Sequence, residues 1–493
     1  MRNPPERGNR RFRQDRRHSE PARTSSPVWT RMTQQHPAPG GYCEILRIAY
    51  PLFLFSASTI VMQFCDRKFL GNSSTEEIAA SLPAGNLAVS LAVFFISMLT
   101  YCSPLTAQLF GARQKDRCVN VLWTGVTASL ICSAVMLLAM PLLGRILLGF
   151  SLREQTFQYA FTYFLTQIPG QIAQCIGAPF FAFYAGRGRT LVVSCVNIGA
   201  ALLNILLDWL LIFGHAGFPK LGIAGAGIAT SLSLILGTVV IAAVVLFEPD
   251  QNEYPTRDWR RFDRDLFRKI FSLGGPSGFQ RLSNSLKFTT MILLVGTLGE
   301  MALASTTISM SIITVSFMPL VSLAEANVIL SGQFIGRGSR DLAETTTYRT
   351  WILAFGYTVA ALICYIFFSR PMIDLFAPAK PSPELPFSLV ADYAWKILII
   401  MGIWLISDTG RYIFGSLLRA AGDTKALLRI NLATAWGLGV PGFVVLALII
   451  RPAVHFVWMY FIFVSLAEAL IIYFRFRSGH WRKIELVHKA PET

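Results

Sequence analysis

The sequence reads LVVSCVNIGAALLNILLDWLLIF at residues 191–213 and GIAGAGIATSLSLILGTVVIAAVVLF at residues 222–247. Each run is almost free of charge and exceeds the roughly 20 apolar residues that a helix needs to cross a bilayer. A strand with free edges cannot be exposed to lipid, because its backbone groups would lack hydrogen-bond partners there. The two runs therefore predict two transmembrane helices.

Runs of the same kind recur along the chain of 493 residues, of which 53% are hydrophobic and 15% are charged. A soluble domain carries about 25% charged residues, so this composition indicates lipid as the solvent. We predict an all-α polytopic membrane protein of about twelve transmembrane helices in two homologous six-helix lobes. The predicted helices are 48–70, 80–107, 121–147, 157–182, 191–214, 222–247, 270–298, 302–330, 346–368, 391–416, 428–450 and 453–475.

The net charge of +16 is unevenly distributed along the chain. Basic residues concentrate near both termini and in alternate connections, whereas the other connections are poor in base. This pattern follows the positive-inside rule and predicts that both termini are cytoplasmic. It argues against nucleic acid as a partner. We expect a multi-pass protein of the plasma membrane, which is the inner membrane in a Gram-negative bacterium.

The first 40 residues differ in composition from the rest of the chain. They are rich in Arg, Pro and Ser, so they cannot bury enough apolar surface to fold alone. Met32 offers an alternative start, which would leave residues 1–31 untranslated. The predicted segments are a disordered basic cytoplasmic tail at 1–40, a first lobe at 41–247, a cytoplasmic linker at 248–269, a second lobe at 270–475 and a cytoplasmic tail at 476–493.

The two halves of the chain repeat each other. A proline near the start of the first helix, a glycine at its end, and a Gln-x-x-Gly motif after the second helix all recur with one offset of 225 residues. Because six helices precede the repeat, the halves have the same orientation in the membrane, an arrangement known from transporters. The corresponding pairs are Pro51 and Pro276, Gly71 and Gly296, Gln108 and Gln333, and Gly111 and Gly336.

Four stretches resemble the multidrug and toxic compound extrusion (MATE) family. They are DRKFLG at 66–71, PLTAQLFGA at 104–112, NILLDWLLIFGHAGFPKLGIAGAGIATSLS at 204–233 and DTGRYIFGSLLRAAGDTKA at 408–426. The resemblance spans about residues 45–475. It implies two six-helix lobes that work by alternating access and export organic, cationic or amphipathic solutes in exchange for H⁺ or Na⁺. We expect a monomer in the lipid bilayer, with a small organic solute and no cofactor besides the coupling ion.

Charged side chains inside a bilayer are costly, which makes them candidates for function. Asp66 and Asp208 lie within predicted helices, and Asn204 precedes Asp208 by one helical turn, on the same face. The resemblance implies that Asp66, Asn204, Asp208 and Thr230 form a proton or Na⁺ site, which makes Asp66, Asn204 and Asp208 possible Na⁺ ligands. The alternative for Asp66 is an ion pair with a neighbouring basic residue near the interface.

The second half departs from the family pattern. One branch of the family has a glutamate eight residues after the proline of helix 7, where this chain has Asn284. Arg281 and Lys287 share a helical face with Asn284, and Asp408 in helix 10 matches the family's acidic residue. We expect Asp408 to pair with Arg281 or Lys287, with Arg411 as a third possible partner. Direct ion coupling and exposure to a central cavity remain alternatives for Asp408.

Two other functions compete with cation-coupled export. The basic residues in helix 7 favour a flippase or exporter of a lipid-linked or anionic molecule on the same fold. A membrane-embedded enzyme is disfavoured, because the sequence has no nucleophile elbow, Walker A motif or His/Cys metal cluster. The eight cysteines form no Cys-x-x-Cys pair, so they predict neither a zinc site nor a disulfide framework. We therefore predict a transporter that is not an enzyme.

Overall fold

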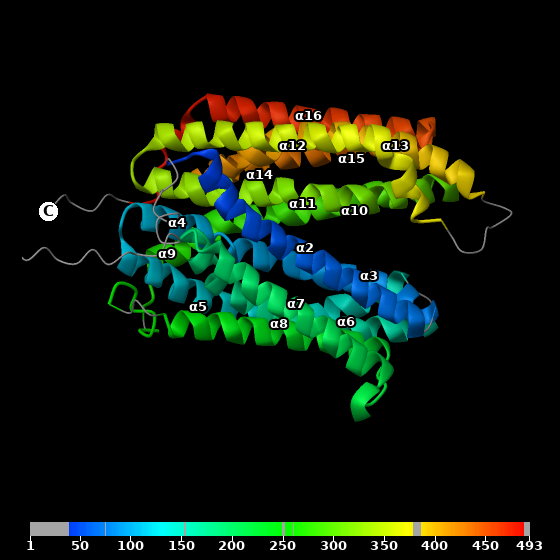
Figure 1. Ribbon diagram of the computed structural model, residues 1–493, viewed down its shortest axis with the longest axis horizontal. Coiled ribbons are helices and arrows are strands. Elements are labelled where there is room, and N and C mark those ends of the chain that lie inside the picture. The colour runs from blue at the N-terminus through cyan, green and yellow to red at the C-terminus, as the bar shows by residue number, and fades with distance from the viewer. Residues whose placement is uncertain are drawn as a thin grey trace, which may run out of the picture. The chain divides into compact units, whose positions relative to one another are not determined.

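The computed structural model describes residues 39–73, 75–151, 154–248, 252–259, 261–377 and 386–487. Within these ranges the chain forms no strand and twelve helical rods, three of which combine two consecutive α-helices, and this confirms the predicted fold class (Figure 1). The helices are α2 (Tyr42–Ser73), α3 (Thr75–Leu99), α4 (Cys102–Gly111), α5 (Lys115–Ser151), α6 (Glu154–Gly186), α7 (Thr190–Phe213), α8 (Ile223–Leu246), α9 (Arg264–Lys269), α10 (Gly275–Gly296), α11 (Glu300–Gly336), α12 (Arg340–Asp374), α13 (Phe387–Ala421), α14 (Thr424–Leu432), α15 (Val440–Val444) and α16 (Val454–Arg477).

Ten of these helical segments in the described residues are long and apolar enough to cross a membrane. The two rods that fall short of this standard are α6 and α10. Each carries several glutamines or charged side chains among its apolar residues. A polar helix is stable within a membrane protein only where its polar face meets protein or water rather than lipid. The positions of α6 and α10 therefore mark the polar interior of the molecule.

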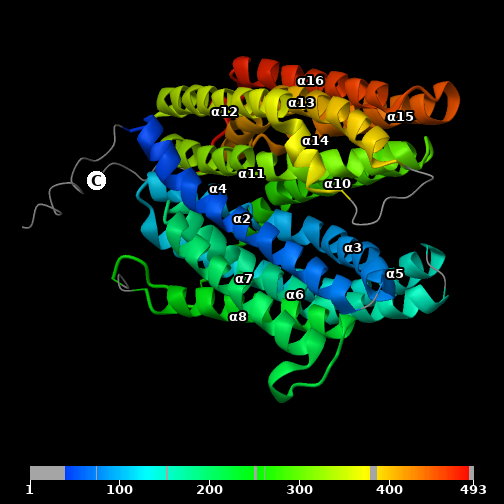
Figure 2. The ribbon, with the colours of Figure 1, turned by 45° about the vertical axis from the view of Figure 1, so that its right-hand side comes forward.

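The helices form two lobes, each with its own hydrophobic core. Helices α3 to α8 surround the first core, and α10 to α16 surround the second (Figures 1 and 2). Helix α2 crosses from one lobe to the other. Its first turns place Ile45, Ile48 and Ala49 in the second core, whereas Leu70 near its end belongs to the first. The sequence predicted that residues 41–247 all belong to the first lobe, and the packing of the first turns of α2 in the second core differs from that prediction.

The linker makes the converse crossing. Leu266 in α9 and Ile270 in the π-helical turn that follows it pack in the first core, although α10 continues into the second lobe. The start of α2 and the segment before α10 thus each pack in the opposite lobe. The two bodies are joined by continuous helical rods, so a change in one lobe can be transmitted to the other.

Two predicted helices are interrupted. The helix predicted at 80–107 is broken between α3 and α4, because Pro104 cannot donate a hydrogen bond to the Thr100 carbonyl and its ring crowds that group. The helix predicted at 428–450 contains two π-helical stretches around Pro441, Ala433–Gly439 and Val445–Ile450. Several other helices, among them α5, α11 and α12, extend beyond their predicted ends.

The base-rich connections gather at one end of the molecule, at the left in Figure 1. We call it the basic end; it includes residues 112–114, 187–189 and 337–339. Glu248 holds this end together by accepting hydrogen bonds from Arg187 at 3.0 Å and Arg189 at 2.7 Å. The predicted C-terminal tail begins with a packed segment, in which Trp481 is buried. The predicted tail at 1–40 lies almost entirely outside the described residues.

Candidate functional site

The structure brings together the four residues expected to form an ion site in the first lobe. Asp66 comes from α2, Asn204 and Asp208 from α7, and Thr230 from α8, and all four are buried. In the amide orientation that satisfies both of its polar atoms, Asn204 donates to Asp66 Oδ1 at 2.9 Å and accepts the Thr230 backbone N–H at 3.2 Å. Asn204 thereby links three helices around the two carboxyl groups.

The Asp66 and Asp208 carboxyl groups face each other. With both groups ionised, neither oxygen of Asp208 has a donor among the described residues. A hydrogen bond between the two forms only when one of them carries a proton. The side chain of Tyr163 from α6 lies close to both carboxyl groups. The sequence analysis did not predict that Tyr163 belongs to this site. The arrangement provides a place for one proton or one small cation.

The alternative role of Asp66 is an ion pair with a neighbouring basic residue near the interface. Arg67 and Lys68 are exposed, and neither forms a salt bridge with Asp66 in the described part of the chain, although the charge of Arg67 is close enough to act on this carboxyl group. Consecutive helical residues point in different directions, which accounts for this arrangement. The role of the cluster in ion coupling stays a prediction.

In the second lobe Asp408 pairs with the third of its expected partners, Arg411, and the preferred expectation of Arg281 or Lys287 was wrong. Asp408 accepts two hydrogen bonds from Arg411, both at 2.6 Å, and a third from Ser465 at 2.7 Å. Arg411 follows Asp408 by three residues on the same face of α13, which suits a bidentate ion pair. Neither Arg281 nor Lys287 forms a salt bridge with this carboxylate within the described residues.

Lys287 instead pairs with Glu468 of α16, at 3.8 Å and almost fully buried. Asn431 donates to Glu468 at 3.0 Å and to Asn284 at 2.8 Å, so an amide joins this pair to the position where a family branch has glutamate. Sequence reasoning missed Glu468 and Asn431. Glu468 had a signal, because it is the one acidic residue in the apolar run 453–474.

Two mutations on α13 compare the contribution of the buried Asp408–Arg411 pair to stability with that of the exposed Asp392–Arg370 pair. We expect Asp408→Ala to destabilise the protein by about 3 kcal/mol, because removing one partner leaves the charge of Arg411 unpaired. The Arg411 side chain is 14% exposed, which places the cost at the lower end of the usual range. Asp392→Ala, which removes the half-exposed partner of Arg370, should cost less than about 1 kcal/mol.

Thermal unfolding in one detergent would measure both variants. Equal melting temperatures for Asp408→Ala and Asp392→Ala would show that the Asp408–Arg411 pair does not stabilise the fold.

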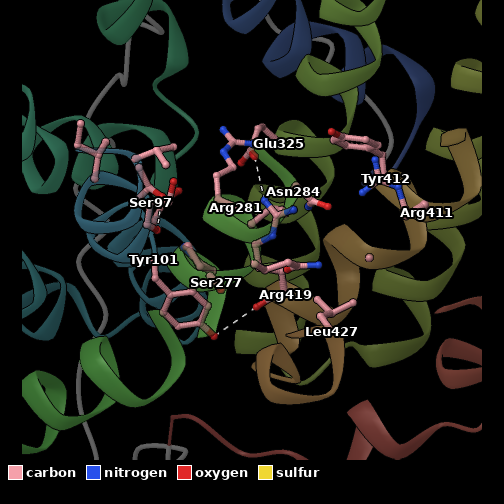
Figure 3. Close-up of a pocket in the computed structure, with 18 of the residues that line it drawn as sticks. Ser97, Tyr101, Ser277, Arg281, Asn284, Glu325, Arg411, Tyr412, Arg419 and Leu427 are labelled. Carbon is pink, nitrogen blue, oxygen red and sulfur yellow. Dashed lines mark hydrogen bonds and ion pairs between the residues drawn. The ribbon is translucent and has the colours of Figure 1, made fainter. Parts of the chain in front are cut away.

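A cavity of about 230 Å³ lies between the lobes. Figure 3 shows Ser97 and Tyr101 of the first lobe on one side, Arg411 and Tyr412 of the second lobe on the other, and Arg281 between them. The polar helices α6 and α10 both line it, which explains why they contain more polar residues than the other rods. Asp66 and Asp208 are not among the residues that line this cavity. The candidate ion site and the cavity are therefore separate.

The repeated Gln-x-x-Gly motif closes the cavity toward the basic end. Gln108 donates to the Ala420 carbonyl at 2.6 Å, and Gln333 donates to the Gly186 carbonyl at 2.9 Å, each across the interface between lobes. A Cβ atom at Gly111 would meet the Gln333 carbonyl oxygen at 2.0 Å. The two copies of the motif therefore pack against each other, and glycine is required for the contact.

A second contact lies between this closure and the cavity. The Tyr101 hydroxyl donates to the Arg419 carbonyl at 3.3 Å, again from one lobe to the other (Figure 3). Both residues line the cavity. The cavity is thus separated from the basic end by two successive interlobe contacts.

Comparisons with known proteins agree with this architecture. A family model described as MatE matches residues 51–210 and 276–445, one match in each half. The chain is 26% identical over 447 residues to the uncharacterized transporter YisQ of Bacillus subtilis, covering 89% of this chain and 94% of the relative. It is 27% identical over 445 residues to the probable multidrug resistance protein NorM of Bradyrhizobium diazoefficiens, covering 88% and 93%.

A solved structure is also similar. The outward-facing conformation of a multidrug resistance MATE family transporter of the MOP superfamily superposes with a TM-score of 0.79 and 18% sequence identity. The match covers 90% of this chain and 96% of that chain. At this identity the likeness shows the fold.

Proposed function

Because this chain belongs to the MATE family of multidrug efflux transporters, we propose that it is a secondary active antiporter that exports organic, cationic or amphipathic, solutes in exchange for H⁺ or Na⁺. The solute occupies the cavity between the lobes, and the ion occupies the cluster of Asp66, Asn204, Asp208 and Thr230. The protein acts as a monomer in the plasma membrane, with the basic end in the cytoplasm, as the positive-inside rule predicts.

The observation that carries this proposal is the buried carboxyl pair of Asp66 and Asp208. Two buried acidic groups that form no salt bridge in the described residues are costly in a membrane unless a mobile cation or proton neutralises them. The first lobe keeps its two carboxyl groups without a salt bridge in the described residues. In the second lobe, Arg411 neutralises Asp408. This difference supports ion coupling through the first lobe.

The path of α2 supports a coupling mechanism. Asp66 is located on the part of α2 that packs in the first lobe, and the first turns of the same helix pack in the second core. Protonation or Na⁺ binding at Asp66 removes a negative charge and changes which packing of α2 is favourable. A shift of α2 would then bias the two lobes between outward-open and inward-open arrangements.

The closed basic end supports the alternating-access part of the proposal. With the basic end in the cytoplasm, the contacts of Gln108, Gln333 and Tyr101 separate the cavity from the cytoplasm. Export requires that these contacts open to admit the solute and reform before its release. The contacts are hydrogen bonds and glycine packing rather than a buried apolar core, so they can separate at modest cost.

Uptake of a fluorescent amphiphile into proteoliposomes, under an imposed H⁺ or Na⁺ gradient, tests the proposed antiport. We expect movement that depends on at least one of the two gradients and stops when an ionophore collapses it. Movement that ignores both gradients would contradict antiport. Absence of movement for both a cationic and an anionic amphiphile, with folded protein, would contradict export of organic solutes.

A further inference from the structure

The cavity between the lobes carries one positive charge that the protein does not neutralise. Three of its lining residues are arginines: Arg281, Arg411 and Arg419. Arg411 is paired with Asp408, and Arg419 donates to Glu325 at 3.0 Å. In the part of the chain that the structure describes, Arg281 has no ion-pair or hydrogen-bond partner. The cavity therefore has a local excess of positive charge at Arg281.

The charge belongs to a polar stripe on α10. Ser277, Gln280, Arg281 and Asn284 all line the cavity, and their spacing of three and four residues places them on one helical face. The Asn284 side chain is held by Asn431 at 2.8 Å, which fixes the rotation of this face toward the cavity. A polar face of this kind is costly in a membrane helix unless it contacts polar groups. We therefore expect the stripe to contact polar groups of a solute inside the cavity.

The wall of the cavity opposite α10 contains one apolar strip, on α3, beside the polar residues Gln171 and Gln174 of α6. Val89, Val93 and Ile96 of α3 face the cavity from the first lobe. A solute that fits both walls has an apolar body and a polar head at α10. Because the head would meet the unpaired guanidinium of Arg281, a negative head is attracted there and a positive head is repelled.

We propose that the cavity binds amphipathic organic anions, with a carboxylate, sulfonate or phosphate group held by Arg281 and the apolar body against α3. The planar guanidinium donates two parallel hydrogen bonds to such a group, and the Gln280 amide lies one residue away on the same stripe. This inference rests on the proposed transport function and names the class of solute at the same site. Of the solutes in the proposed function, it selects amphipathic ones with a negative head group and excludes the cationic ones.

Two probes of matched size and opposite charge test the proposal: 1-naphthalenesulfonate and 1-naphthyltrimethylammonium. Binding is measured by fluorescence with the full chain in lipid nanodiscs, after subtraction of the signal from protein-free nanodiscs. The native chain should bind the sulfonate more tightly than the ammonium. Arg281→Gln should weaken sulfonate binding by about 10- to 100-fold, the usual contribution of a charge-assisted hydrogen bond.

Further variants separate charge from a general loss of structure. Arg281→Lys should retain most of the sulfonate affinity, and Arg281→Glu should reverse the preference in favour of the ammonium. Arg337→Gln serves as the matched control, because it removes the same charge from an exposed position at the basic end, away from the cavity. It should leave both affinities unchanged.

The proposal is overturned if the folded native chain binds the ammonium more tightly, if it binds no sulfonate, or if Arg281→Gln and Arg337→Gln behave alike. No ion gradient is present in this assay. Failure of antiport, measured by gradient-driven uptake, is therefore distinct from failure of anion binding.

Discussion

Asp208→Asn is expected to reduce gradient-driven transport to the level of empty liposomes. The substitution preserves the size of the side chain, but the amide cannot take up a proton and lacks the negative charge that attracts a cation. With one carboxyl group left, Asp66 no longer faces a second carboxyl group that could share a proton with it. The ion-dependent change at α2 would then have no driving force, although the helices keep their packing.

The measurement is uptake of the fluorescent amphiphile in proteoliposomes, with equal amounts of reconstituted protein confirmed for each variant. Asp341→Asn is the matched control, because that carboxylate is 89% exposed in an ion pair with Arg482 at the basic end. It should transport like the native chain. Full activity of Asp208→Asn would show that the carboxyl pair is a structural feature and that coupling, if present, takes place elsewhere.

Gly336→Ala is expected to hold the basic end open. A Cβ atom at this position would lie 1.9 Å from the Gln108 carbonyl oxygen, which is backbone and cannot move aside without separating the lobes. Overpacking of this kind costs about 1–3 kcal/mol, and it arises only in the arrangement in which the basic end is closed. It should therefore shift the balance between arrangements by roughly 5- to 150-fold toward the open one.

Spin labels at Arg113 and Arg337, one on each lobe at the basic end, would report this shift as a longer distance. Gly111→Ala should give the same result, because the repeat places it against the Gln333 carbonyl in the same way. Gly356→Ala is the matched control, since a Cβ atom there meets nothing within 4 Å. An unchanged distance in both Gly336→Ala and Gly111→Ala would show that the motif does not close this end.

The sequence alone was sufficient for the membrane fold and the duplication, and its resemblance to the MATE family named the residues of the first acidic cluster. Apolar runs such as 191–213 are long enough to leave one physical solution, a helix, because lipid offers no partner for free backbone groups. Asn204 and Asp208 could be placed on one face by their spacing, since one helical turn fixes that relation locally. The repeat at one constant offset indicated two lobes of the same orientation.

The partners of charged side chains depended on tertiary structure. Spacing within α13 allowed the pair of Asp408 with Arg411, but only the structure showed that α10 does not supply the partner. Lys287 of α10 pairs instead with Glu468, nearly 200 residues away in the chain. Spacing along a helix states which residues share a face, but not which helix that face meets. The crossing of α2 between the lobes and the unpaired charge of Arg281 in the cavity follow from the packing of distant helices, and this packing is set by side-chain contacts that no local pattern records.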